Sequence, residues 1–145
     1  MLQYGDINMI TNSLKRASER SELCKIICLI NKDINLVAIV NKNGRIIDSK
    51  FNNNENLNHI SVQELEMISM QRTLQTTMIK EFDNKLSFFR NTVTLRKSLV
   101  EFVYPLDDEI LLVISKADID IKQVSDKLFS LISSFCLSYV STKVI

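Results

Sequence analysis

Apolar and polar residues follow two periods along this chain, one typical of helices and one typical of strands. Apolar residues three and four positions apart predict a helix over residues 11–31, capped at Thr11 or Asn12. The segment Ile34–Val40 and residues 110–114 are almost wholly apolar, as in strands covered on both faces. Alternation and turn signals predict further strands over residues 45–50, 86–97 and 98–106, and helical spacing predicts helices over residues 61–84 and from Asp118 or Asp120 to about Tyr139.

These elements follow the order helix, two strands, helix, three strands, helix. The chain has 145 residues, which fits one domain. Two glycines and one proline leave few breaks between regular elements. We therefore predict a single domain over residues 1–145, with its core over about residues 11–139.

The stretch VAIVNKNGRIIDSK, residues 37–50, predicts a β-hairpin. Asn43 and Gly44 lie between its two apolar runs, and both residue types accept the positive φ that a primed two-residue turn requires. A phosphate-binding loop needs a second glycine and a following helix, whereas this stretch has one glycine followed by a strand. Asn43 and Gly44 are therefore predicted to form a structural turn rather than a nucleotide site.

The predicted middle helix carries more apolar surface than one packing face requires. It opens with Ser61 and Glu64 at the spacing of a capping box. Leu65, Ile68, Ile79 and Phe82 form one apolar face, Met67, Met70, Leu74 and Met78 form an adjacent one, and the remaining polar arc includes Ser69, Thr73 and Thr76. The first face is expected to cover the sheet. The second is buried within the subunit, lies between subunits or lines a small-molecule groove, and the intersubunit alternative is favoured.

Charge is nearly balanced overall but uneven along the chain. The net charge is +1, which gives no basic excess to hold nucleic acid. Residues 72–97 contain six basic and two acidic residues, and residues 101–126 contain seven acidic and two basic ones. This pattern indicates either two solvated faces or a patch that steers a charged partner.

Candidate catalytic and metal-binding groups are few. The three cysteines lie in apolar helical contexts, and an odd count without a signal peptide favours buried thiols in a reducing cytoplasm. His59 is the only histidine and has no triad partner nearby, while the acidic turn at residues 107–109 has too few ligands for calcium and is expected to be solvated. We predict no catalytic residue, no bound metal and no cofactor. No apolar run approaches the roughly 20 residues that cross a bilayer, so membrane insertion is not expected either.

The element order and three segments resemble the roadblock/longin-like superfamily, whose layout is similar to profilin. The matching segments are AIVNKNGRIID at the hairpin, LEMISMQRTLQTTMIKEFDNKL in the middle helix and VYPLDDEILLVIS before the last helix. More narrowly, the chain resembles an uncharacterised archaeal family with a roadblock-type core. The resemblance implies an α+β fold, an α/β/α sandwich with a central five-stranded antiparallel sheet. The first and last helices would lie on one face and the middle helix on the other.

The resemblance also implies a dimer, because roadblock domains commonly pair through the middle helix and the third strand. On this chain the matching positions are Met67, Met70, Leu74, Met78, Phe89, Asn91, Val93 and Leu95. Relatives serve as scaffolds, motor-complex light chains or regulators of Ras-like GTPases. We therefore expect a non-enzymatic homodimeric interaction module that regulates or adapts a small GTPase or a larger complex. The alternative is a small-molecule-sensing domain of the same layout.

Overall fold

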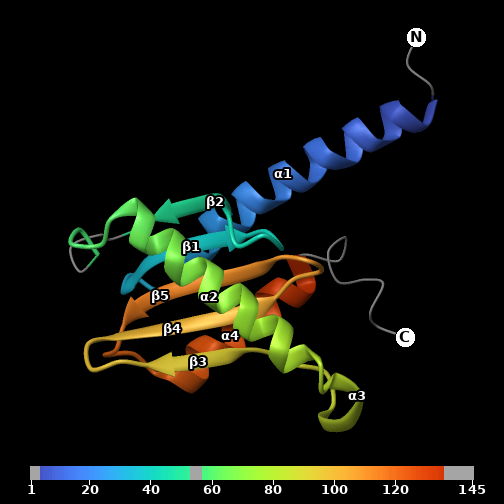
Figure 1. The fold of residues 1–145 in the computed structure, drawn as a ribbon. Helices are drawn as coiled ribbons and strands as arrows, with labels where there is room; N and C mark the ends of the chain where they lie inside the picture. Colours follow the sequence, from blue (N-terminus) through green and yellow to red (C-terminus); the bar gives the residue numbers. More distant parts are fainter. Residues whose placement is uncertain (1–3, 53–56, 136–145) are drawn as a thin grey trace.

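A computed structural model of the protein describes the backbone of residues 4–52 and 57–135, and the side chains of residues 17–52 and 57–134. The elements are α1 (Tyr4–Ile30), β1 (Ile34–Val40), β2 (Ile46–Phe51), α2 (Val62–Lys80), α3 (Asp83–Leu86), β3 (Thr92–Leu95), β4 (Leu99–Pro105), β5 (Ile110–Lys116) and α4 (Ile121–Phe135) (Figure 1). The predicted order is confirmed, with the short helix α3 added before the third strand. The predicted helix end near Tyr139 lies outside the described residues, as does Cys136.

The five strands form one antiparallel sheet in the order β2-β1-β5-β4-β3. The strands β1 and β5 lie inside the sheet and are buried along almost their whole length, because helices cover both faces there. The strands β2 and β3 are the two edges. The expected α+β class with a five-stranded antiparallel sheet is confirmed.

Helices cover both faces of the sheet, and the sandwich has two separate cores. On the face covered by α1 and α4, the core includes Leu23, Phe102 and Leu128. On the face covered by α2, a smaller core forms around Val103 and Leu112 (Figure 1). The first and last helices thus share one face and the middle helix covers the other, as the resemblance implies.

The turn between β1 and β2 differs from the predicted type. Gly44 has a φ of +80°, but Asn43 does not share it, since Ser87 is the one non-glycine with positive φ in the described part of the chain. The Gly44 N–H donates to the Asn41 carbonyl at 2.9 Å. The Asn41 side-chain oxygen accepts from the N–H groups of Asn43 and Arg45, at 3.0 Å each. These bonds stabilise a type I turn followed by a left-handed glycine, so the predicted primed turn is wrong.

The start of α2 is confirmed as a capping box. The Ser61 hydroxyl accepts from the Glu64 N–H, and the Glu64 carboxylate accepts from the Ser61 N–H, both at 3.0 Å. The bond from the Ser61 backbone lowers the pKa of the Glu64 carboxyl. These bonds satisfy donors that the first turn of a helix leaves free, which fixes where α2 begins.

Two predicted boundaries are wrong. The first helix begins at Tyr4 instead of Thr11, because the segment contains no proline and one early glycine, so nothing stops the helix at the polar residues. The third strand is the four-residue β3 instead of residues 86–97. Leu86 belongs instead to α3, and residues 87–91 form an irregular segment in which the Phe89 N–H donates to the Asp83 carboxylate at 3.0 Å.

The acidic turn between β4 and β5 was expected to be solvated, but it is only partly so. Glu109 is buried, and its carboxylate accepts from the Arg20 guanidinium at 2.7 and 3.2 Å. Arg20 lies in α1, so this bidentate pair ties the first helix to the turn that leads into β5. The prediction failed because the partner lies 89 positions away in sequence.

Candidate interaction surface

The face that α2 turns toward the sheet is polar and small. Ser69, Thr73 and Thr76 are its buried residues, whereas Leu65 and Ile68 pack beside them at the margin of the α2-side core. The Ser69 and Thr73 hydroxyls donate to the carbonyls four residues earlier, each at 2.9 Å, so neither hydroxyl is left unsatisfied by burial. Their small size lets the helix lie close to the sheet. The expected apolar face therefore contributes Leu65 and Ile68 to the contact with the sheet, but the buried centre of that contact is polar.

The methionine face is the second apolar face of α2 and consists of Met67, Met70, Leu74 and Met78. These side chains are between 49% and 63% exposed. At about 100° per residue they lie on the side of the helix roughly opposite Ser69, Thr73 and Thr76. The described part of the chain therefore does not bury this face.

The edge strand β3 presents free backbone groups to solvent. The Arg96 N–H donates to the Leu99 carbonyl at 2.9 Å at the end of the β3–β4 pair. Because antiparallel pairs alternate, Thr94 and Thr92 then face β4, and the backbone N–H and C=O groups of Val93 and Leu95 point outward.

The side chains of β3 divide between the two faces of the sheet. Val93 and Leu95 pair with Phe102 and Val100, which belong to the core under α1 and α4. The methionine face lies on the other side of the sheet. The predicted interface residues thus occupy one exposed helix face and one free edge, not a single flat patch.

Two other predicted interface residues precede β3 and are engaged within the chain. The Asn91 side-chain amide donates to the Ser125 hydroxyl of α4 at 3.1 Å. Phe89 is half-buried, and its N–H donates to Asp83. Both residues therefore anchor the segment that enters β3.

A carboxylate lies buried between α2 and β4. Glu101 is 4% exposed, and its two oxygens accept from Arg72 at 2.8 and 3.2 Å and from Arg96 at 2.9 Å. Arg72 reaches down from α2, whereas Arg96 follows β3 and is 57% exposed. Burial raises the pKa of the Glu101 carboxyl, but the hydrogen bonds and charges of both arginines outweigh it and leave the pKa lowered. This cluster joins α2 to the β3–β4 hairpin.

The uneven charge along the sequence is partly neutralised inside the fold. Arg90 donates to the Asp126 carboxylate at 2.8 Å and lies 4.5 Å from the centre of the Phe129 ring. Arg90–Asp126 and the ion pairs of Glu101 with Arg72 and Arg96 each join the basic segment, residues 72–97, to the acidic segment, residues 101–126. The expectation of solvated charge is wrong for Arg72 and Glu101, which are largely buried, whereas Arg90, Arg96 and Asp126 stay exposed, and the pairing leaves less charge to steer a partner.

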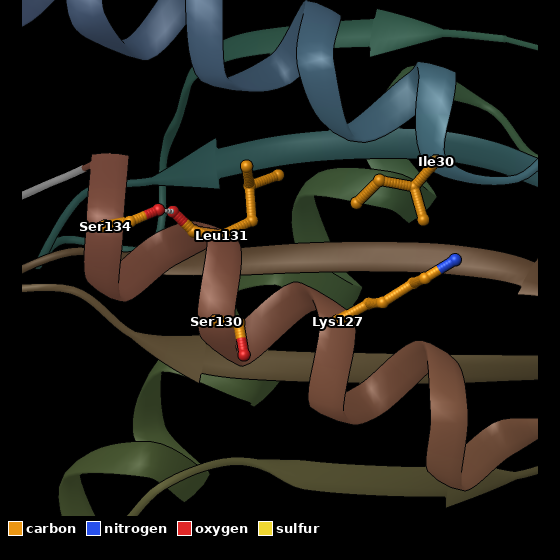
Figure 2. Close-up of a pocket in the computed structure, with 5 residues that line it drawn as sticks. All are labelled: Ile30, Lys127, Ser130, Leu131 and Ser134. Carbon is orange, nitrogen blue, oxygen red and sulfur yellow. Dashed lines mark hydrogen bonds between the residues drawn. The ribbon is translucent and has the colours of Figure 1, made fainter.

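A groove of about 340 Å³ lies between α1 and α4. Ile30 and Leu131 contribute apolar side chains, and Lys127, Ser130 and Ser134 supply the polar groups (Figure 2). The Ser134 hydroxyl donates to the Leu131 carbonyl at 3.2 Å, so it is already engaged. A small-molecule site needs polar groups that converge on a ligand, and this groove offers few.

The cysteines and the histidine do not form a reactive centre. Cys24 and Cys28 are buried and form no disulfide. Burial raises the pKa of Cys28, more than the charge of Lys50 lowers it, so the thiol is held protonated. His59 is exposed in the turn before α2. Among the side chains that the structure describes, those of residues 17–52 and 57–134, no three from Cys, His, Asp or Glu lie together as a metal site requires. Over residues 4–52 and 57–135 no helix has both the length and the apolarity needed to cross a bilayer.

Sequence patterns missed three features of this surface. Ser69, Thr73 and Thr76 resemble a solvent face because the residues are polar. The pairing of Glu101 with Arg72 had no local signal, since Arg72 lies 29 positions earlier. The alternating pattern from residue 86 onward predicted a strand and so hid the short helix α3. Asp83, five residues before Phe88 and Phe89, was a turn signal that could have indicated it.

Comparisons with solved structures identify this fold. A Roadblock/LC7 domain from Streptomyces avermitilis superposes with a TM-score of 0.61 at 10% identity, covering 79% of this chain and 92% of that one. MglB of Myxococcus xanthus gives 0.56 at 16% identity, covering 82% and 91%. The gliding protein MglB of Thermus thermophilus gives 0.55 at 12% identity, covering 83% and 90%.

Sequence comparisons add nothing to this likeness. The chain matches no protein-family model and no curated protein. At such low identity the structural likeness shows the fold alone, and this chain has the α+β sandwich of Roadblock/LC7 domains.

Proposed function

We propose that the protein is a non-enzymatic interaction module that forms a symmetric homodimer through β3 and the methionine face. The observation that carries the proposal is a pair of uncharged surfaces, one an unprotected strand edge and the other an apolar helix face. Natural sheets tend to protect such edges, and monomers rarely expose such helix faces.

The edge of β3 lacks the usual protection against pairing. Thr92–Leu95 contains no charge, no proline and no glycine. The opposite edge, β2, carries Asp48 and Lys50 and so has charges of the kind that discourage pairing. This contrast favours β3 as the edge that pairs.

The exposed arc of α2 is suited to contact with its own copy. Between residues 67 and 78 its exposed side chains are all uncharged: Met67, Met70, Gln71, Leu74, Gln75, Thr77 and Met78. A two-fold interface brings the same surface patch of both copies together, so like charges there would repel. An uncharged arc avoids this cost.

Symmetry then sets the arrangement. A two-fold axis perpendicular to the sheet at β3 pairs the two strands antiparallel and keeps both α2 helices on one face of a joined sheet. Such an interface would bury on the order of 1,200 to 2,000 Å² in total.

Light scattering coupled to size exclusion tests the dimer at tens of micromolar. The natural protein is expected to show twice the chain mass. Val93→Pro blocks the outward N–H of β3 without removing a bond to β4, and Leu74→Glu places a charge on the methionine face, so each is expected to give one chain mass. Phe51→Glu, on the β2 edge and similarly exposed, is the matched control and stays dimeric. A monomeric natural protein would refute the homodimer.

We further propose that a second protein binds to the α2 side of this dimer. The methionine face is buried between the two copies in this dimer, so the partner would bind the outer surface of the paired α2 helices. The resemblance to roadblock domains makes a small Ras-like GTPase the expected partner class. Pull-down from the native cell followed by mass spectrometry tests it, with Leu74→Glu and Phe51→Glu as paired baits. Because Leu74→Glu is expected to be monomeric and Phe51→Glu dimeric, recovery of the same proteins by both baits would refute a partner site that needs the dimer.

We also propose a reducing, cytoplasmic location for the protein. The buried cysteines Cys24 and Cys28, which form no disulfide, support it, because reduced thiols persist where disulfides do not form. Cell fractionation checks this location, and recovery from an oxidising compartment would refute it.

A further inference from the structure

The connection from α2 to β3 presents three exposed apolar side chains. Phe82, Leu86 and Phe88 are between 56% and 78% exposed, and we refer to them as the apolar tip. Large apolar side chains scattered singly need no explanation, but three within seven residues at one end of an edge strand form a patch.

The backbone of the apolar tip is held in a costly conformation. Ser87 has φ 72° and ψ 168°, a region that residues other than glycine rarely adopt, at a cost of about 1–3 kcal/mol. The Phe89 N–H bond to Asp83 and the Leu86 N–H bond to the Phe82 carbonyl, at 3.0 and 2.8 Å, hold the turn around it. A strained residue of this kind persists only where the surrounding structure holds it in place. Here the held turn leaves the side chains of the apolar tip exposed.

The other end of β3 has the opposite chemistry. The turn into β4 carries the exposed residues Leu95, Arg96, Lys97 and Ser98, and no acidic residue lies between Thr92 and Val100. Figure 1 shows α3 and this turn at opposite ends of β3. One end of the strand is therefore aromatic and the other is cationic.

We propose that the apolar tip of one copy packs against the β3–β4 turn of a second copy. The inference rests on the proposed self-association through β3. When two copies of a strand pair antiparallel, the segment entering the strand in one lies beside the segment leaving it in the other. The tip enters β3 and the basic turn leaves it, so symmetry brings them together twice in each dimer.

The chemistry of the two ends is complementary. Arginine and lysine cations are attracted to the faces of phenylalanine rings, and their alkyl stems cover apolar surface. Lys97 would meet Phe88 in this way, and the alkyl stem of Arg96, whose guanidinium binds Glu101, would cover apolar surface beside it. Leu95 supplies an apolar contact beside them.

A charge exchange tests the contact. Phe88→Lys sets lysine against Lys97, and Lys97→Glu sets a carboxylate against the Phe88 ring. Each variant alone is expected to raise the dimer dissociation constant by at least about tenfold, because each contact occurs twice. In an equimolar mixture, heterodimers are expected to exceed their random share, since each contains one Lys–Glu contact and one native contact. Native mass spectrometry counts the species.

Two control variants carry the same charge changes away from β3. Phe51→Lys on the β2 edge and Lys25→Glu on the exposed side of α1 are expected to leave the dissociation constant within about threefold of the natural value, because β2 is the opposite edge of the sheet and α1 packs on β1 and β2. Unchanged dissociation constants for Phe88→Lys and Lys97→Glu, or a random mixture of the two, would overturn this inference while leaving the dimer intact. A monomeric natural protein would overturn the proposed dimer as well.

Discussion

Replacing Glu101 by glutamine removes the carboxylate that binds two guanidinium groups beneath α2. Breaking a buried ion pair by removing one partner costs about 3–5 kcal/mol, because the other charge stays buried and unpaired. Arg72 is only 13% exposed and would bear this cost, whereas the exposed Arg96 regains water and contributes at most about 1 kcal/mol. We therefore expect Glu101→Gln to lower the free energy of unfolding by about 3 kcal/mol at neutral pH.

The effect of this substitution depends on pH in a fixed direction. The pKa of Glu101 is lowered in the folded protein, whereas in the unfolded chain it lies near the ordinary value of about 4.3. The carboxylate therefore stabilises the fold fully above the unfolded pKa, and this contribution is lost as pH falls through the folded pKa. The difference between the natural protein and Glu101→Gln is expected to shrink in acid.

Urea unfolding followed by far-ultraviolet circular dichroism measures both effects, at neutral pH and in steps down to about pH 3, below the ordinary glutamate pKa. Glu22→Gln, an exposed change on α1, is the matched control and is expected to shift stability by less than about 0.5 kcal/mol. Arg96→Met is expected to cost at most about 1 kcal/mol. A Glu101→Gln effect below about 1 kcal/mol at neutral pH, or one that grows in acid, would refute the reasoning.

Three further changes test the turn, the core and the helix start by the same unfolding assay. Gly44→Val is expected to cost more than about 2 kcal/mol, because a φ of +80° disfavours a branched residue and its Cβ would lie 3.0 Å from the Met70 Cα; an unchanged midpoint would contradict this. Tyr104→Phe removes a hydroxyl that donates to the Ser125 carbonyl at 2.6 Å, and a loss of about 1–2 kcal/mol is expected, with no loss counting against it. Ser61→Ala removes half of the capping box and is expected to cost about 1 kcal/mol, whereas an increase in stability would show that the box does not hold α2.

Local chemistry in the sequence was sufficient to predict the order of the elements. The capping box at Ser61 and the apolar run of Ile34–Val40 depend on residues within a few positions of one another, and both appear where expected. The hairpin position was also local, but its turn type was decided by the Asn41 side chain, which competes for the same N–H groups. Period and capping therefore determine where elements form.

The tertiary structure alone decided how α2 is turned and which charges meet. A helix with two apolar faces fits a sheet in more than one rotation, and the small residues Ser69, Thr73 and Thr76 face the sheet because they permit close approach, with the Ser69 and Thr73 hydroxyls satisfied within the helix. The pairing of Arg72 with Glu101 joins segments that are distant in sequence. Such outcomes depend on the shape of the opposing sheet, and no local pattern along the chain encodes that shape.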